Sequence, residues 1–406
     1  MRLQGIMRRM NYWTGVVWMH RIGVVTGTRA EYGLLKPLIE KIDADDDLSL
    51  CLIVTGAHLE ERLGYTCREI EKDGFFISYK VPMHLVSDQP KGICRSMGVE
   101  MSELAGILEQ EKLDLLFLLG DRYETFIAAA AAMLFCVPIA HLHGGEVTEG
   151  AIDDAIRHSI SKMSAIHFTS TELSARRLRQ MGEPPERIFC VGALGVENIK
   201  NAVYYSREEL CRRYHPLFDK PYILVTYHPV TLDGNTGSPP QALFEELLQV
   251  LSLNPAYHYV FTYANADAGG DGINQRINSF VEKNINTCAF QSMGQRGYLS
   301  ALKYAACVAG NSSSGILEAP SFHIPTVNIG DRQKGRECAG SVISCGNSRE
   351  EIRRAFAYAL SGDFADKCKN CENPYEGKDT SSNIIRITKQ MLGKGITLRK
   401  TFADML

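Results

Sequence analysis

Residues 113–146 read LDLLFLLGDRYETFIAAAAAMLFCVPIAHLHGGE, and this stretch decides the fold class. It opens with a nearly continuous apolar run at 113–119, and a second apolar run follows at 137–141. The apolar residues between them, 126–135, predict a helix that we expect to lie in the core rather than at an interface. Strands that are apolar on both faces and separated by helices are typical of parallel sheets covered on both sides. The stretch therefore predicts an α/β protein.

The same alternation runs along most of the chain and predicts twelve strands in two groups of six. The first group lies at 22–26, 50–55, 113–119, 137–141, 165–169 and 188–191, and the second at 222–227, 257–263, 287–290, 307–309, 325–329 and 341–344. Two such groups predict two doubly wound Rossmann-like domains facing a cleft. We expect them at 21–205 and 206–380, with the seam in the polar stretch 206–220.

Length, charge and hydropathy exclude several classes of protein. The chain has 406 residues, which is too many for one ordinary core and suits two domains. A formal net charge of -3 disfavours nucleic-acid partners, because proteins that bind nucleic acids usually carry an excess of basic residues. No apolar run reaches the roughly 18 residues that span a membrane. Residues 1–20 lack a signal-peptide cleavage site, and we expect them to be a disordered extension or sequence upstream of a start at Met19.

The cysteines indicate a reducing, cytoplasmic environment. The chain has 12 of them, spread thinly, and several lie inside apolar runs. The one close pair, Cys368 and Cys371, has no second CxxC and no nearby histidine, so we expect an ordinary reduced pair. No histidine spacing offers convergent metal ligands. We predict no metal and no cofactor.

Glycine and polar residues collect directly after the predicted strands, at the edge where open parallel sheets bind ligands. The loop GNSSSG at 310–315 is the strongest phosphate signal, because Ser312 and Ser313 open a helix whose free N–H groups would face an anion. Glu318, one turn into that helix, is placed to bind a ribose diol, and Arg29 would contact the same phosphates from across the cleft. A plain serine N-cap is the alternative interpretation. Neither loop is a Walker A or GxGxxG motif, which disfavours ATPases and nicotinamide dehydrogenases.

Acidic residues form the second group of candidates. Asp121, Glu146 and Asp153 lie at or just beyond two strand ends that we expect to be neighbours, and carboxylates with separated pKa values suit proton abstraction and donation. Asp121 could instead cap the following helix, and Asp153 could pair with Arg157. Glu146 has no such local alternative. His228 closes a strand of the second group and could bind phosphate or carry a proton at neutral pH.

Five segments together resemble the hydrolysing UDP-N-acetylglucosamine 2-epimerases of the bacterial sialic-acid and legionaminic-acid type. They are GTRAEYG at 27–33, LLGDRYE at 118–124, HLHGGEVTEGAIDDAIRHSISK at 141–162, YHPVT at 227–231 and GNSSSGILEAPSFHIPTVNIGDRQKGRE at 310–337. The resemblance spans about 21–387 and implies a fold of glycosyltransferase-B type. It also implies a C-terminal helix at 381–406 that packs back on the N-terminal domain, and a homodimer.

The resemblance assigns roles to residues already selected as candidates. It implies that the catalytic residues are Asp121, Glu146, Asp153 and His228. It implies that Arg29, Ser312 and Ser313 contact the diphosphate of UDP and Glu318 its ribose. Arg122 and Asn265, which also follow predicted strands, are further candidates for binding UDP. The sequence HPVT at 228–231, where the non-hydrolysing relatives carry His-Arg-Arg-Glu, favours the hydrolysing branch.

The implied reaction turns UDP-N-acetylglucosamine and water into N-acetylmannosamine and UDP, for sialic acid biosynthesis. It breaks an O-glycosyl bond: loss of the C2 proton and of UDP gives a 2-acetamidoglycal, which is then hydrated. A sister activity on UDP-2,4-diacetamido-2,4,6-trideoxyglucose, towards legionaminic acid, fits the same residues. A glycosyltransferase of the same architecture and a non-catalytic UDP-sugar sensor are further alternatives.

Overall fold

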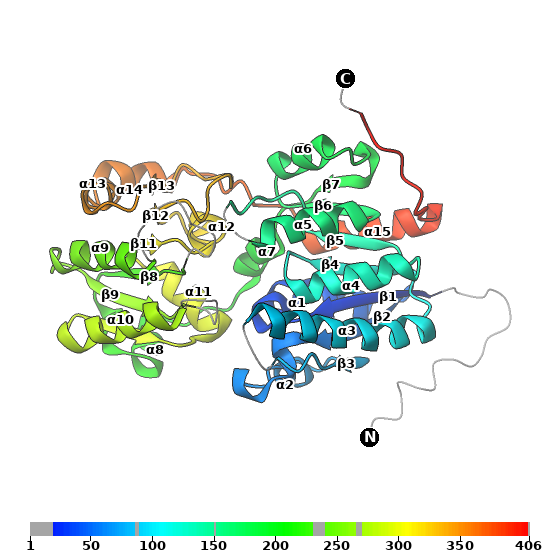
Figure 1. Ribbon diagram of the computed structural model, residues 1–406. Helices are drawn as coiled ribbons and strands as arrows, with labels where there is room; N and C mark the ends of the chain where they lie inside the picture. Colours follow the sequence, from blue (N-terminus) through cyan, green and yellow to red (C-terminus); the bar gives the residue numbers. More distant parts are fainter. Residues whose placement is uncertain (1–18, 86–88, 150–151, 230–239, 265–269, 405–406) are drawn as a thin grey trace.

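The computed structural model describes residues 19–85, 89–149, 152–229, 240–264 and 270–404. Figure 1 shows two lobes, and each is built on one parallel sheet. The first sheet has seven strands in the order β3-β2-β1-β4-β5-β6-β7, and the second has six in the order β10-β9-β8-β11-β12-β13. The strand order reverses between β1 and β4 and between β8 and β11, which are the points where open sheets bind ligands. The two doubly wound sheets predicted from the sequence are confirmed.

The strand positions agree with the apolar runs to within one or two residues. The first sheet comprises β1 (His20–Thr26), β2 (Leu48–Thr55), β3 (Tyr79–Val81), β4 (Leu115–Leu119), β5 (Ile139–Leu142), β6 (Ile166–Thr169) and β7 (Ile188–Cys190). The second comprises β8 (Tyr222–Thr226), β9 (His258–Thr262), β10 (Thr287–Phe290), β11 (Cys307–Gly310), β12 (Thr326–Ile329) and β13 (Val342–Cys345). The sequence does not predict β3, a three-residue edge strand. β1 begins at His20, inside the segment expected to lie outside the fold.

Helices cover both faces of each sheet (Figure 1). In the first lobe they are α1 (Arg29–Ala44), α2 (Cys67–Lys72), α3 (Pro90–Gln110), α4 (Tyr123–Leu134), α5 (Ile152–Met163), α6 (Glu172–Gln180) and α7 (Leu194–Asn201). The rest are α8 (Arg207–Arg213), α9 (Pro240–Ser252), α10 (Gly270–Lys283), α11 (Gly294–Tyr304), α12 (Ser314–Leu317), α13 (Arg349–Ala359), α14 (Gly362–Lys369) and α15 (Thr380–Lys394). Although α15 comes last in the chain, it packs against α1, where Lys389 Nζ lies 2.9 Å from Asp45 Oδ1.

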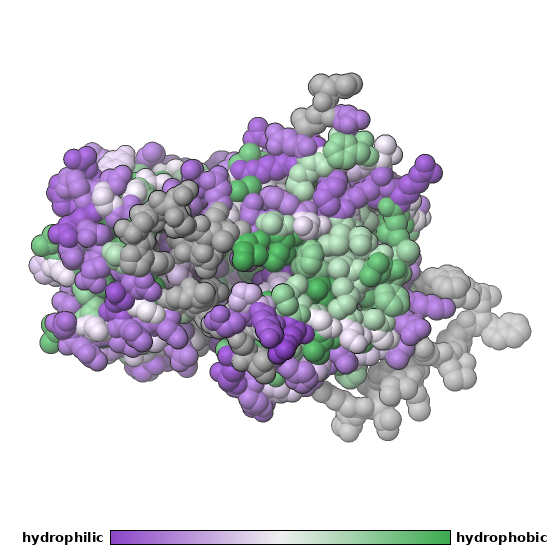
Figure 2. All heavy atoms as spheres, viewed as in Figure 1, coloured by the Kyte–Doolittle hydropathy of each residue, from purple (hydrophilic) through white to green (hydrophobic). Residues whose placement is uncertain are grey.

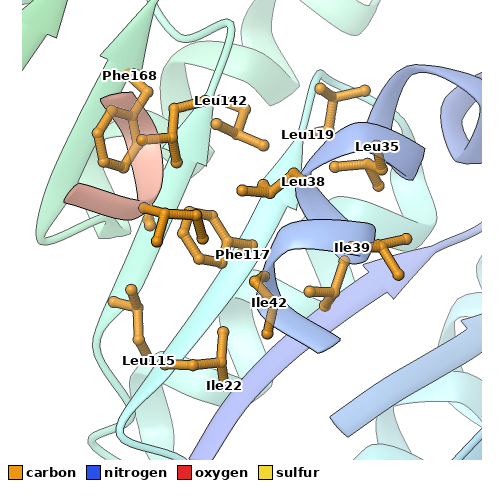
Figure 3. Packing of buried hydrophobic residues seen from close by; sticks show 14 of the residues in the cluster. Ile22, Leu35, Leu38, Ile39, Ile42, Leu115, Phe117, Leu119, Leu142 and Phe168 are labelled. Carbon is orange, nitrogen blue, oxygen red and sulfur yellow. The ribbon is translucent and has the colours of Figure 1, made fainter. Parts of the chain in front are cut away.

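The core of the first lobe shows why α1 lies on this sheet. Leu35, Leu38, Ile39 and Ile42 recur at spacings of three and four, and all are fully buried. They pack on side chains of β1, β4, β5 and β6, among them Ile22, Leu115, Phe117, Leu119, Leu142 and Phe168 (Figure 3). Burying each such side chain contributes roughly 1.5–3 kcal/mol relative to exposure. The packing fixes β1 and β4 and therefore the strand ends that carry the candidate site.

The apolar segment at 126–135 is buried only in part. Ile127 and the alanines of α4 that follow it lie in the core, apart from Ala130, which is partly exposed. Met133, Leu134 and Phe135, at the end of the helix, are 48%, 71% and 40% exposed. Figure 2 shows apolar residues gathered on this side of the first lobe. The expectation that the whole segment is core is therefore wrong for its last three residues.

All twelve cysteines are free thiols, and Cys368 of the close pair is buried. Within the described ranges, no group of three His, Cys, Asp or Glu side chains is arranged to hold a metal ion. The described helices also include none that combines the length and the apolar character needed to cross a membrane.

Candidate active site

Two of the predicted acidic residues lie at neighbouring strand ends of the first sheet. β4 pairs with β5, as expected, and Asp121 follows β4 while Glu146 lies four residues beyond β5. Asp121 does not cap α4, whose N-cap is Arg122. Its Oδ2 instead accepts a hydrogen bond from Arg157 Nη2. Arg157, on α5, is 2% exposed and also donates to the Glu146 carbonyl at 2.9 Å, so one buried guanidinium ties the two strand ends together.

Glu146 is buried and fully engaged. Its Oε1 accepts from Ser170 Oγ at 2.8 Å and lies 3.1 Å from His143 Nδ1. Its Oε2 lies 3.0 Å from Arg336 Nη1, which belongs to the second lobe. Burial by itself would raise the pKa of this carboxyl, but Arg336, His143 and Ser170 together lower it to about 2. Glu146 is therefore a carboxylate at any physiological pH.

The loop DRQKGRE at 331–337, which follows β12, bridges the two lobes. Besides the pair between Arg336 and Glu146, Arg177 Nη2 of the first lobe donates to the Gly335 carbonyl at 2.6 Å. From the same loop, Gln333 Nε2 donates to the Asn311 carbonyl at 2.9 Å. The loop thus joins the acidic strand ends of the first lobe to the serine loop of the second. No role for Arg336 could be predicted from the sequence, although it is one of the charged residues in the segment after a predicted strand.

The serine loop begins where β11 passes very close to β8. Gly310 has φ +127°, and a Cβ there would collide with the Thr226 carbonyl oxygen, so only glycine fits. Ser313 is the N-cap of α12, but its side chain makes no capping hydrogen bond. The N-cap alternative therefore does not account for the Ser313 hydroxyl, whereas Ser312 Oγ accepts a hydrogen bond from the Ser314 backbone N–H at 3.4 Å, as a capping side chain does. Glu318 accepts a hydrogen bond from Ser314 Oγ, and burial raises the pKa of its carboxyl.

His228 lies beside the serine loop at the end of β8. Its backbone N–H donates to Asn311 Oδ1 at 2.7 Å, and Asn311 Nδ2 donates back to its carbonyl at 2.8 Å. Burial, and then the charge of Arg332, lower the pKa of the His228 imidazole to about 3. The ring is therefore neutral at neutral pH.

The structure also describes Arg29, Arg122 and Asp153 among the remaining predicted site residues. Arg29, the first residue of α1, donates from Nη1 to Ser292 Oγ of the second lobe at 3.1 Å, and its Nε lies 2.9 Å from Glu69 Oε2. Arg122 Nε is 2.5 Å from Glu124 Oε1, a carboxylate that raises the pKa of the arginine. Asp153 is exposed in the first turn of α5. Asn265 lies outside the described residues.

The segment that builds both lobes matches a known protein family. Residues 40–389 match the family model of UDP-N-acetylglucosamine 2-epimerase. The chain belongs to that family. The resemblance found in the sequence is confirmed.

Relatives within the epimerase family place the chain in its hydrolysing branch. The GDP/UDP-N,N'-diacetylbacillosamine 2-epimerase (hydrolyzing) of Campylobacter jejuni is 40% identical over 95% of this chain and 99% of its own length. The polysialic acid biosynthesis protein P7 of Escherichia coli is 35% identical over 95% of this chain and 98% of its own. The UDP-N,N'-diacetylbacillosamine 2-epimerase (hydrolyzing) of Legionella pneumophila is 35% identical over 91% and 96%.

A solved epimerase structure shares the two-lobed fold. The UDP-GlcNAc 2-epimerase of Neisseria meningitidis, bound to UDP-GlcNAc, superimposes with a TM-score of 0.77 over 91% of this chain and 100% of its own. The sequence identity is 19%, so this likeness shows the fold alone. The predicted glycosyltransferase-B arrangement is confirmed.

Proposed function

We propose that this protein is a hydrolysing 2-epimerase acting on UDP-N,N'-diacetylbacillosamine. Two relatives at 40% and 35% identity carry this activity in their names, which supports it. Diacetylbacillosamine is 2,4-diacetamido-2,4,6-trideoxyglucose, the second of the two substrates that fit the sequence. The first, UDP-N-acetylglucosamine, has less support, although the relative from Escherichia coli belongs to polysialic acid biosynthesis.

The single observation that carries the chemistry is the pair of carboxylates at the ends of β4 and β5, each bonded to an arginine. Asp121 is bonded to Arg157, and Glu146 to Arg336. Epimerisation with hydrolysis needs a group that takes the C2 proton, a group that returns a proton to the opposite face, and a charge-stabilising cradle for the departing UDP. A binding protein without catalysis has no use for such an acidic cluster.

The reaction that we propose has two stages. A base takes the C2 proton, the C2–H electron pair forms a C1=C2 double bond, and the C1–O bond breaks with its electron pair on the β-phosphate of UDP. Water then adds to C1, and a proton adds to C2 from the opposite face. Because the C2 proton is not acidic, departure of UDP must supply much of the driving force.

The roles of individual residues follow from this scheme. We place four of them at the sugar, as catalytic or positioning groups: Asp121, Glu146, Asp153 and His228. The cradle for UDP comprises Arg29, Arg122, Asn265, Ser312, Ser313 and Glu318. Arg29 and the serine loop would stabilise the negative charge that develops on the diphosphate.

We also propose that the protein is a homodimer and that it is located in the cytoplasm. The exposed apolar end of α4 supports a homodimer, since a cluster of large apolar side chains at a helix end is a candidate contact surface. Light scattering of the wild type and of Leu134→Glu tests this, and a monomeric wild type contradicts it. Twelve free thiols support a cytoplasmic location.

The substrate is tested by supplying UDP-N,N'-diacetylbacillosamine and UDP-N-acetylglucosamine side by side and identifying the sugar released. We expect kcat/KM to be at least tenfold higher for the diacetamido sugar, with release of UDP and the 2-epimeric free sugar. An equal or higher value for UDP-N-acetylglucosamine contradicts the substrate assignment. A sugar transferred to an acceptor would indicate the glycosyltransferase alternative, and binding without turnover would indicate the sensor.

A further inference from the structure

His143 has a backbone conformation that is uncommon for a residue with a side chain. It follows β5 with φ +65°, in the left-handed region, where a non-glycine residue is strained by roughly 1–2 kcal/mol. Its N–H donates to the Phe168 carbonyl at 3.0 Å. A Cβ on the next residue, Gly144, would lie 2.8 Å from His141 Nδ1, so the chain is packed tightly here. Strain of this kind persists where the surroundings impose it and occurs preferentially at functional sites.

The His143 ring is held in one tautomer. Its Nδ1 lies 3.1 Å from Glu146 Oε1. An ionised carboxylate can only accept, so Nδ1 carries the proton and Nε2 of the neutral ring presents a lone pair. Nε2 is buried and has no hydrogen-bond partner among the described residues. Leaving a buried polar atom unpaired costs about 1–3 kcal/mol. The lone pair of this nitrogen is therefore free to accept a proton from a bound substrate.

The charged and titratable groups around this ring come from several elements. Glu146 faces it from the same loop, and Arg336 of the second lobe holds the far oxygen of that carboxylate. His141 on β5 is a neighbouring imidazole, whose pKa burial lowers to about 3, so it adds no charge at neutral pH. A carboxylate that fixes the tautomer of a histidine also stabilises the imidazolium formed when Nε2 takes up a proton.

We propose that His143 is the base that takes the C2 proton and that Glu146 is its positioning residue. This proposal rests on the proposed function and deepens it. Both oxygens of Glu146 are already bonded, to His143 and Ser170 on one side and to Arg336 on the other, so its own capacity to accept a proton is small. The proton moves from C2 to Nε2, the C2–H electron pair becomes the C1=C2 bond, and UDP leaves with the C1–O pair. The imidazolium then loses its proton to solvent, because C2 is reprotonated from the opposite face.

The test is His143→Asn, because asparagine tolerates the left-handed backbone and retains a donor near Glu146 but has no base at the place of Nε2. We expect kcat to fall by about 10²–10⁴-fold, the range for loss of a general base. We expect UDP affinity and the melting temperature to change little. His323→Asn is the matched control, since His323 also has a positive φ of 56° but is exposed in the second lobe, and it should retain wild-type activity.

A second readout separates proton transfer from a merely structural role. With substrate deuterated at C2, the isotope effect on kcat should rise in His143→Asn, because C–H cleavage becomes rate-limiting. In Glu146→Gln, we expect a lower kcat with a nearly unchanged KM for the UDP-sugar, because the imidazole loses the carboxylate that orients it. A His143→Asn enzyme that retains more than a tenth of the wild-type kcat overturns the proposal. If the wild type itself turns over neither UDP-sugar, the proposed function fails instead.

Discussion

Replacing Arg336 with methionine removes the charge that the second lobe places on Glu146. The two side chains are 11% and 5% exposed and their charged atoms are 3.0 Å apart, so the pair is shielded from water. Methionine keeps most of the length and apolar volume of the arginine, so the loop at 331–337 should keep its position. We expect the variant to fold and to bind UDP but to lose most of its activity at neutral pH.

The magnitude follows from the geometry of the pair. At 3.0 Å and an effective dielectric constant of about 20, the attraction is about 5.5 kcal/mol, and breaking a buried pair costs about 3–5 kcal/mol in practice. Because Glu146 keeps Ser170 and His143, we take the lower limit, about 3 kcal/mol. At about 1.36 kcal/mol for each factor of ten, kcat/KM should fall roughly a hundredfold. Arg336 lowers the pKa of the Glu146 carboxyl, so loss of this positive charge should raise that pKa and move the acid limb of the pH profile to higher pH.

The assay is continuous detection of released UDP from pH 5 to 9, with Lys334→Met as the matched control. Lys334 lies in the same loop, but its pair with Glu149 spans 3.6 Å, and the side chains are 60% and 51% exposed. Such a surface pair contributes about 0–1 kcal/mol, so kcat/KM should change only a few-fold at most. Equal losses in the two variants, or an Arg336→Met enzyme within threefold of the wild type at every pH, would refute this reasoning.

Three further predictions concern other parts of the chain. Burial, and then the charge of Glu124, raise the pKa of Glu100 to about 9 from its usual 4.5. The contribution of protonated Glu100 to the free energy of unfolding is therefore fully present below pH 4.5 and is lost as the pH rises towards 9. Glu100→Gln should therefore raise the melting temperature at pH 9 by a few degrees and leave it nearly unchanged at pH 5; a gain that is equal at both pH values contradicts this. Removing both hydroxyls of the serine loop (Ser312→Ala with Ser313→Ala) should raise the Kd of UDP by at least about a hundredfold in calorimetry, since two hydrogen bonds to a charged group contribute about 1.5–3 kcal/mol each, and a change below threefold would exclude a diphosphate contact. Lys400→Met should lower the free energy of unfolding in urea by about 2 kcal/mol, because Lys400 Nζ lies 2.6 Å from the fully buried Glu183, which retains Lys162 and His167; an unchanged midpoint contradicts this.

The architecture could be predicted from the sequence because each strand and helix shows a pattern of apolar residues within its own short segment of the chain. Each buried parallel strand is an apolar run, and α1 shows its buried stripe in the spacing of Leu35, Leu38 and Ile42. The short edge strand β3 could not be predicted in this way, since only its last residue, Val81, is buried. The exposed end of α4 was also missed, because Leu134 and Phe135 look like core residues when composition is the only guide.

Which residues belong to the candidate site could be predicted from the sequence, but the side chains to which they bond could not. Asp121 and Glu146 were identified from their places after strands, and the pairing of β4 with β5 brings them together. The partners Arg157 and Arg336 come from a helix and from the other lobe, and no local spacing encodes those contacts. His143 follows a predicted strand, but its left-handed backbone and its contact with Glu146 appear only in the three-dimensional structure.

The most direct test of the elimination mechanism is the fate of solvent isotopes in the products. The wild type is incubated with UDP-N,N'-diacetylbacillosamine in water enriched in both deuterium and oxygen-18, and the sugar and UDP are analysed by NMR and mass spectrometry. We expect one deuterium at C2 of the released sugar and no oxygen-18 in UDP, because the C1–O bond breaks and C2 is reprotonated from solvent. A sugar without deuterium at C2, or UDP that carries oxygen-18, would contradict it.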